Sequence, residues 1–314
     1  MISHKIKEEQ FTVGALSVVK IDGIELFDVN KVFDCGKCFR FDRVTDSAHE
    51  KEFAGCAHEK YISVAQDGDT VYIYNSNLDE YESLWKTYLG LDRDYGEINE
   101  DILSLSDNPA LYDAINKASG IRILKQDEWE AICSFIISQN NNIPRIKKLI
   151  SAISLSCGEK IDVSLMQEHV ADAHRSNEGN FYSFPKPEAL LKLGISGLAE
   201  LKTGFRAKYI YDAAEKMSCG NINTHLISQM STTNAIDELC RVKGIGPKVA
   251  SCALLFGFEK LDAFPVDVWI KKVMAKYFDE SFTPESLGRY AGIAQQYLFY
   301  YERYLQSKGD RNDP

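Results

Sequence analysis

Lys248 and Asp267 are the residues of this 314-residue chain whose types and spacing most directly predict a chemical reaction. Lys248 directly follows a Val-Lys-Gly-Ile-Gly-Pro run, Val242–Pro247, in which the glycines permit positive φ angles and the proline suits a first helical position. A lysine at a helix amino terminus lies at the positive end of the helix dipole, which disfavours its ammonium form. Because a neutral amine attacks electrophilic carbon and forms a Schiff base, the run predicts a tight turn that presents a nucleophile.

Asp267 and Cys252 complete this group of candidate residues. Asp267 follows a Pro-Val step and precedes a helical pattern, so its side chain is a good amino-terminal helix cap. A carboxylate that caps a helix can also stabilise a developing positive charge. Cys252 lies four residues after Lys248, on the same helix face, so we expect the two side chains to face a common cavity.

The same turn predicts a contact with phosphate. The backbone N–H groups of Gly244, Gly246 and the first helical turn are expected to form a concave site for a phosphate oxygen, with Lys243 beside them. A Gly-x-Gly motif alone is weak evidence, because it also occurs at corners between helices of other proteins. The lysine and the aspartate that follow at fixed spacing make this motif more specific.

Together, Gly244–Lys248 and Pro265–Asp267 resemble the helix–hairpin–helix and Gly/Pro-Asp signature of base-excision DNA glycosylases. In that superfamily, a lysine at the position of Lys248 implies the bifunctional branch, in which an amine displaces the base and the Schiff base then undergoes β-elimination. Further segments resemble the 8-oxoguanine DNA glycosylases. The resemblance implies an α+β fold, with a twisted antiparallel sheet like that of the TATA-binding protein over residues 1–110 and an all-α helix–hairpin–helix glycosylase core over residues 111–314.

One of these segments contains three consecutive asparagines after a run of apolar residues in helical spacing. On spacing alone this is a polar junction between helices, because asparagine is a poor interior helix residue and a good cap. The resemblance implies that Asn140 fills the space left by an extruded base and that Arg145 reads the cytosine left behind. The segment that contains Phe205 and Arg206 also resembles the family. The resemblance implies that Phe205 wedges into the base stack and that Arg206 contacts the same cytosine.

The segment Cys35–Phe41 resembles the Gly-Gln-x-Phe-Arg-Trp strand start of the family. By this resemblance the carbonyl of Gly36 accepts a hydrogen bond from N7–H, a proton that 8-oxoguanine has and guanine lacks. Leaving a buried carbonyl without its partner costs about 1–3 kcal/mol, which would disfavour the intact base. Lys37 departs from the glutamine of the family. A zinc site is the alternative, because Cys56 and His58 follow the cysteine pair in this segment, although structural zinc sites usually use two closely spaced pairs.

Gln295 and Phe299 lie four residues apart near the carboxyl end and share a helix face. The resemblance implies that Gln295 bonds the Watson–Crick edge of the base and that Phe299 stacks on its ring opposite Cys252. Without the resemblance, Phe299 would be assigned to core packing. Trp269 stands where the family often has a histidine that contacts a DNA phosphate, and an indole offers only one N–H and no charge.

The net charge of −10 is unusual for a protein that binds DNA. The acidic excess lies in residues 1–110, which have 11 Lys and Arg against 22 Asp and Glu, whereas the other residues have 25 against 24. We therefore expect backbone amides to share the binding of phosphate and the salt dependence to be shallow.

The eight cysteines, without a signal peptide or an apolar run near 18 residues, favour free thiols in a reducing compartment. A related branch of the superfamily holds an iron–sulfur cluster with four cysteines after the aspartate, and this chain has none beyond Cys252. We expect no metal, no cofactor, no membrane association and a monomer. The expected partner is double-stranded DNA that contains 8-oxoguanine, and the expected location is intracellular, in cytoplasm and nucleoid or in a nucleus.

The apolar pattern predicts strands in about the first hundred residues and helices from about Asp79 onward. The expected strands are Phe11–Lys20, Val32–Val44, Tyr61–Ala65 and Thr70–Tyr74, with a hairpin turn at Asp67–Asp69. The expected helices start near Pro109, Glu128, Ile143, Pro187, Arg206, Asn234, Pro247, Val266 and Pro284, and Gly158–Ser183 is the expected long loop.

The predicted function is base-excision removal of 8-oxoguanine opposite cytosine through a Schiff base on Lys248, with an associated lyase activity. Three alternatives stay open. An alkylpurine glycosylase would use water and would not need this lysine; a glycosylase for oxidised pyrimidines would normally have the cluster cysteines; and a non-enzymatic DNA-binding module would use the turn only to hold phosphate.

Overall fold

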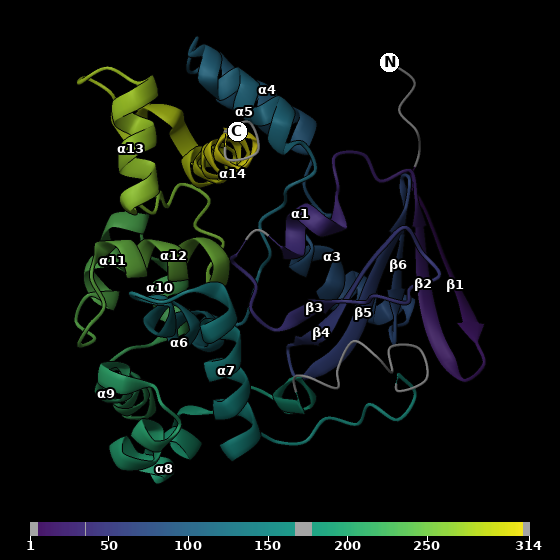
Figure 1. Cartoon of the computed structure of the whole chain (residues 1–314), viewed down its shortest axis with the longest axis vertical. Helices are drawn as coiled ribbons and strands as arrows, with labels where there is room; N and C mark the ends of the chain where they lie inside the picture. Colours follow the sequence, from purple (N-terminus) through teal and green to yellow (C-terminus); the bar gives the residue numbers. More distant parts are fainter. Residues whose placement is uncertain (1–5, 35, 167–177, 310–314) are drawn as a thin grey trace.

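The computed structural model describes residues 6–34, 36–166 and 178–309, and it places a six-stranded antiparallel sheet beside a larger group of helices (Figure 1). The sheet has the order β1-β2-β6-β5-β4-β3. Its strands are β1 (Lys7–Val13), β2 (Leu16–Asp22), β3 (Phe41–Arg43), β4 (Lys51–Ala57), β5 (Lys60–Asp67) and β6 (Thr70–Tyr74). The predicted order of an antiparallel sheet followed by a helical core is confirmed.

Short helices accompany the sheet, and longer helices form the core. The former are α1 (Val29–Phe33), α2 (Leu78–Glu80), the π turn η1 (Tyr81–Trp85) and α3 (Lys86–Tyr88). The latter are α4 (Tyr95–Ser104), α5 (Pro109–Ala118), α6 (Glu128–Ser138), α7 (Ile143–Cys157), α8 (Pro187–Glu200), α9 (Ala207–Ser218), α10 (Thr224–Gln229), α11 (Thr232–Leu239), α12 (Pro247–Gly257), α13 (Val268–Tyr277) and α14 (Ala291–Gly309). Three short 3₁₀ helices in the described part of the chain are η2 (Glu178–Phe181), η3 (Gly204–Arg206) and η4 (Pro284–Tyr290).

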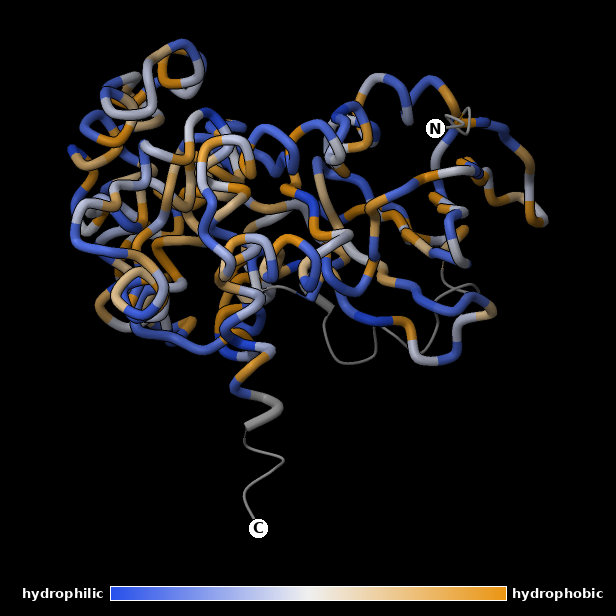
Figure 2. Tube along the Cα trace, turned by 90° about the horizontal axis from the view of Figure 1, so that it is seen from above, coloured by the Kyte–Doolittle hydropathy of each residue, from blue (hydrophilic) through white to orange (hydrophobic). Residues whose placement is uncertain are grey.

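Both faces of the sheet carry buried residues, although the edge strand β1 is mostly exposed. Alternate residues of a strand point to opposite faces, so neighbours in one strand belong to different apolar clusters. Val19 and Ile21 of β2 belong to an apolar cluster that includes Trp85. Val18 of the same strand belongs to a second cluster, which includes Met166 from the long connection after α7. The hydrophobic stretches gather inside the two parts of the molecule, while hydrophilic stretches occupy many of the outer turns (Figure 2).

Helix α12, which carries Lys248 and Cys252, lies in the centre of the helical core. Each of its residues from Val249 to Gly257 is buried. It packs on α6 so closely that a Cβ added to Gly257 would lie 2.8 Å from the Cβ of Ala131. This packing fixes the position of the helix whose first turn contains the candidate nucleophile.

Of the four predicted strands, the two that correspond to β5 and β6 were correct and the two that precede them were wrong. Strand β6 and the turn before it lie where they were expected, and β5 contains the predicted Tyr61–Ala65. The expected strand Phe11–Lys20 is instead a hairpin of β1 and β2 that turns at Gly14, where φ is +60°. The expected strand Val32–Val44 was also wrong: its first residues end α1, and only Phe41–Arg43 forms β3.

Most predicted helix starts are confirmed to within two residues, including those of α5, α6, α7, α8 and α12. Helices α4 and α10 and strand β4 were not predicted. At Pro284 the structure has the 3₁₀ segment η4 before α14 begins. The division expected after residue 110 falls inside α5 and stays a prediction. No helix in the described part of the chain is both long and apolar enough to cross a membrane.

Arg122 connects the sheet region to the start of the helical core. It lies in the segment between α5 and α6, is 7% exposed, and stacks 4.5 Å from the centroid of the Tyr95 ring. Its guanidinium donates hydrogen bonds to the backbone carbonyls of Leu26 (3.0 Å), Gly90 (2.6 Å), Arg93 (3.1 Å) and Glu25 (2.8 Å). A single side chain therefore satisfies carbonyls from two separate loops.

Replacing Arg122 with methionine should lower the free energy of unfolding by about 3 kcal/mol, because four backbone carbonyls in buried or partly buried positions lose their donor. Arg43→Met is the matched control, since it changes an exposed arginine on β3, and it should cost less than about 0.5 kcal/mol. Urea unfolding of both variants measures the difference. Equal shifts would contradict a structural role for the buried arginine.

Candidate active site and DNA-binding surface

The glycine-rich turn joins α11 to α12 and packs against α9. Gly244 has a φ of +85°, and a Cβ placed there would lie 2.3 Å from Cδ2 of Tyr209. Gly246 has a φ of −109° and caps α12 with extended backbone, so only the first glycine uses the left-handed conformation. The Lys243 N–H donates to the carboxylate of Asp212 at 2.7 Å, which ties the turn to α9.

Three charged side chains influence the thiol of Cys252, which is 1% exposed. Burial raises the pKa of this thiol, the positive charges of Lys37 and Lys248 oppose the rise, and the negative charge of Asp267 adds to it. Because electrostatic effects fall off with distance, each of these three charges lies within electrostatic reach of the thiol. Lys248 itself is partly exposed, as access to a substrate requires.

Asp267 caps α13, as the sequence predicted. Its Oδ1 accepts a hydrogen bond from the Ile270 N–H at 2.8 Å, and its backbone is extended. The cap holds the carboxylate in one orientation at the start of the helix. One oxygen of the carboxylate is thereby used for structure, and the group lies near enough to influence Cys252.

The loop that contains Gly36 reaches from the sheet region to the helical core. Gly36 has a φ of +76°, and a Cβ placed there would lie 2.9 Å from Cδ1 of Ile143, in the first turn of α7. The carbonyl of Lys37 accepts a hydrogen bond from Nε2 of Gln126 at 3.1 Å. The positive φ favours glycine at this position, whereas the contact with Ile143 involves only the tip of a flexible side chain.

The Lys37 side chain extends to α14. Its Nζ lies 4.4 Å from the centroid of the Phe299 ring and 5.8 Å from that of Phe256 on α12. On the same helix as Phe299, Gln295 is 1% exposed and accepts a hydrogen bond from Gln296. The structure thus brings together the predicted Gly36 loop, Cys252 and Phe299, with Lys37 among them.

Asn140 and Arg206 form a second group. Asn140 is exposed and has a left-handed backbone, with a φ of +47°. Arg206 is 4% exposed, and its guanidinium donates to the carbonyls of Gln139 (3.0 Å), Asn140 (3.1 Å) and Thr203 (3.3 Å). It therefore holds the backbone of the asparagine run in place, and it also lies over the ring of Phe205 at 4.4 Å.

The other residues expected to contact DNA lie on the surface. Arg145 is exposed in the first turn of α7, close enough for its charge to join burial in lowering the pKa of Arg206. Phe205 is 45% exposed and packs edge-on against Tyr209, the ring beneath the glycine-rich turn. Trp269 on α13 is 38% exposed. An exposed aromatic ring beside a phosphate-sized turn is an arrangement suited to DNA.

Two family models match this chain. One, described as "8-oxoguanine DNA glycosylase, N-terminal domain", matches residues 19–132, and the other, "HhH-GPD superfamily base excision DNA repair protein", matches residues 133–286. A crystal structure of the Clostridium acetobutylicum 8-oxoguanine glycosylase/lyase, in complex with double-stranded DNA containing cytosine opposite to 8-oxoG, is 35% identical, with a TM-score of 0.80 over 98% of this chain and 100% of that chain. The chain belongs to the 8-oxoguanine DNA glycosylase family.

Curated relatives have names of the same kind. The probable N-glycosylase/DNA lyase of Methanothermobacter thermautotrophicus is 28% identical over 233 residues, which cover 65% of this chain and 70% of the relative. The N-glycosylase/DNA lyase OGG1 of Arabidopsis thaliana is 30% identical over 200 residues, covering 57% of this chain and 51% of the relative. The match therefore spans about half the length of the Arabidopsis protein.

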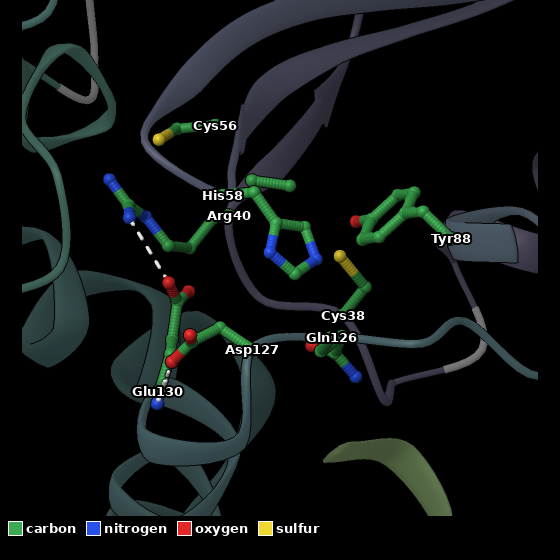
Figure 3. Close-up of a pocket in the computed structure, with 9 residues that line it drawn as sticks. Cys38, Arg40, Cys56, His58, Tyr88, Gln126, Asp127 and Glu130 are labelled. Atoms are coloured by element: carbon green, nitrogen blue, oxygen red, sulfur yellow. Dashed lines mark hydrogen bonds and ion pairs between the residues drawn. The ribbon is translucent and has the colours of Figure 1, made fainter. Parts of the chain in front are cut away.

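A small cavity of about 10 Å³ lies where the sheet of this glycosylase meets α6 (Figure 3). Arg40, which is 2% exposed, pairs there with Glu130 (Nη1 to Oε2, 3.4 Å) and donates to the carbonyl of Gly179 at 3.2 Å. Sequence reasoning gave these two residues no role. The only sign of a buried pair in the sequence was that each of these charged residues has apolar residues on both sides.

The residues considered for zinc lie around this cavity. Cys38, Cys56 and His58 line it together with Arg40 and Tyr88 (Figure 3). Burial raises the pKa of the Cys56 thiol to about 12, so the thiolate that zinc requires is disfavoured. Within the described residues there is no group of three or more His, Cys, Asp or Glu side chains that could hold a metal. Cys35, the remaining candidate, lies outside the described residues.

Gly244→Ala should destabilise the protein by about 2–4 kcal/mol, because the new methyl group would meet the Tyr209 ring in a strained backbone conformation. Gly220→Ala is the control: φ there is also positive, at +76°, but nothing lies within 4 Å of the added Cβ. That variant should lose only about 1 kcal/mol. Thermal unfolding of the two variants compares them, and equal losses would show that the contact with Tyr209 contributes nothing.

Proposed function

We propose that this glycosylase removes 8-oxoguanine from duplex DNA, opposite cytosine, through a Schiff base on Lys248, and then cleaves the strand by β-elimination. One observation carries the proposal. The charges of Lys248 and Asp267 act on the buried Cys252 thiol, as does that of Lys37, whose Nζ lies 4.4 Å from the centroid of the Phe299 ring. A nucleophile, a carboxylate and an aromatic surface for a base therefore converge. The similarity to a structure solved with cytosine opposite to 8-oxoG supports the choice of substrate.

The base pocket is proposed to lie between Cys252 and Phe299, with Gly36 and Gln295 at its edges. The Gly36 carbonyl would accept the N7–H of 8-oxoguanine, and Gln295 would bond its Watson–Crick edge after giving up its present bond to Gln296. Extruding a base costs a few kcal/mol, which contacts in the pocket and on the opposite strand must offset.

The proposed reaction begins with attack of the Lys248 amine on C1′ of the sugar. The C1′–N9 bond breaks, the electron pair leaves with the base, and the base takes up a proton at N9. Asp267 stabilises the positive charge that develops on the sugar and accepts or orients the proton of the amine. The nitrogen of Lys248 then loses its remaining proton, the C1′–O4′ bond breaks and O4′ takes up a proton, which opens the sugar ring and gives the Schiff base. The Schiff base loses a proton from C2′, and the C3′–O bond breaks, which nicks the strand 3′ to the lesion.

On the opposite strand, Asn140 and Phe205 are proposed to fill and wedge the base stack. Arg145 would provide the larger contact with cytosine, because its side chain is exposed. Arg206 would act mainly by holding Asn140, since most of its N–H groups already donate to backbone carbonyls. A bidentate arginine contact with a base contributes about 1–3 kcal/mol of discrimination, so we expect cytosine to be preferred over adenine.

The glycine-rich turn is proposed to bind a phosphate through backbone N–H groups of Gly244, Gly246 and the first turn of α12. Lys243 contributes its charge from an exposed position. Trp269 contributes one N–H or an aromatic contact, with Lys272 Nζ lying 5.3 Å from its ring as a nearby cation. Few side-chain cations are thus committed to phosphate, which is consistent with a shallow salt dependence.

Borohydride trapping tests the proposed function. A duplex with 8-oxoguanine opposite cytosine should give a covalent adduct with the natural protein, because reduction fixes a Schiff base, and Lys248→Gln should give none. An undamaged duplex should give no adduct, and adenine opposite the lesion should give less than cytosine. Release of the free base by the Lys248→Gln variant would favour a water-using glycosylase instead. Binding to DNA without adduct or base release would favour a non-enzymatic module.

The Asp267→Asn variant removes the negative charge of this side chain but keeps its ability to cap the helix. The asparagine side chain can still accept the Ile270 N–H, so stability should change by less than about 0.5 kcal/mol. The single-turnover rate of base release should fall by about 10²–10³-fold, as it does when one electrostatic group is lost from an active site. Asp267→Ala is the comparison, and it should lose about 1 kcal/mol of stability as well. An unchanged rate in the asparagine variant would exclude a role for the charge.

A further inference from the structure

Lys37 places a second amine within the walls of the proposed base pocket. Its Nζ lies 4.4 Å from the centroid of Phe299 and 5.8 Å from that of Phe256. Its charge also acts on the buried thiol of Cys252. An ammonium so close to a ring centroid makes a cation–π contact. The amine therefore lies near both of the surfaces between which the base is proposed to stack.

A base and this ammonium cannot use that space together. A flat ring stacked on Phe299 lies in van der Waals contact with it, at about 3.5–4 Å between carbon atoms. The ammonium at 4.4 Å occupies the same layer. Either the amine moves away when the base enters, or the base does not reach the ring.

We propose that the Lys37 ammonium occupies the place of the base in the DNA-free glycosylase and that an incoming base must displace it. This inference rests on the proposed function of the pocket. Lys37 then competes with every base that is turned into the site. Because the penalty is the same for each base, it lowers their occupancy of the pocket without changing the ratio of affinities between 8-oxoguanine and guanine.

The surroundings of Lys37 allow such a movement. The backbone is fixed, because its carbonyl bonds to Gln126 and the preceding glycine packs against Ile143. The side chain is only partly buried and is held by ring contacts rather than by a carboxylate in the described structure. The guanidinium of Arg303 lies 5.7 Å from the centroid of the same Phe299 ring, so a second cation already contacts this aromatic surface. Rotation of the side chain can therefore clear the ring while the loop stays in place.

The test compares the binding of three duplexes, each with cytosine opposite the central position, to proteins that cannot cleave them. The central position holds 8-oxoguanine, guanine or a stable abasic analogue that has no base to insert. Lys248→Gln provides the background, and Lys37→Gln, Lys37→Met and Lys37→Arg are added to it. Fluorescence anisotropy gives the dissociation constants.

Lys37→Gln and Lys37→Met should strengthen binding of the 8-oxoguanine duplex, relative to the abasic duplex, by about two- to fivefold, the equivalent of about 0.5–1 kcal/mol. The guanine duplex should gain no more than that, and Lys37→Arg, which keeps a cation, should change little. An unchanged or lower ratio of lesion to abasic binding in both neutral variants would overturn the proposal. If the background protein itself bound the lesion no better than guanine, the proposed function would fail first, and the inference with it.

Discussion

The buried ion pair between Arg40 and Glu130 joins the two parts of the chain that together form the proposed site. Arg40 follows the Gly36 loop by four residues, and Glu130 lies on α6, the helix that packs directly on α12. The pair therefore sets where a loop from the sheet meets the helix that carries Lys248. A charge buried without its partner is strongly destabilising, so the two parts of the chain are held in one arrangement.

In this arrangement, the helical core and the sheet region each contribute different residues to the proposed site. The helical core provides Lys248, Asp267, Cys252 and Phe299, and the sheet region provides the Gly36 loop. In the proposed mechanism, chemistry and recognition of the lesion therefore come from segments more than 200 residues apart in the sequence. This separation explains why a glycine with positive φ, packed against the first turn of α7, is found so far from the nucleophile.

Local signals predicted the features that local forces determine. The turn before Lys248, the Asp267 cap and strand β6 each follow from the preferences of a few neighbouring residues. The hairpin of β1 and β2 was missed because the apolar pattern continues through its two-residue turn, in which Gly14 is followed by the apolar Ala15. Strand β4 was missed because its Ala-Gly-Cys-Ala end has little of the β-branched and aromatic character that identifies strands.

Long-range contacts could not be predicted in the same way. Arg122 and Arg206 donate to backbone carbonyls, and any residue offers a carbonyl, so no sequence pattern marks those partners. The position of Lys37 over Phe299 depends on the packing of a loop on α14. The sequence showed only that Lys37 departs from the family pattern, and the structure places this departure inside the proposed pocket.

The central claim is that Lys248 is the amine that attacks the sugar, although Lys37 lies close to the same pocket. Mass spectrometry of the borohydride-trapped adduct, after digestion of protein and DNA, tests it most directly. We predict that the sugar fragment is found on the peptide that contains Lys248. A fragment attached to the peptide of Lys37, or to any other amine, would contradict the assignment.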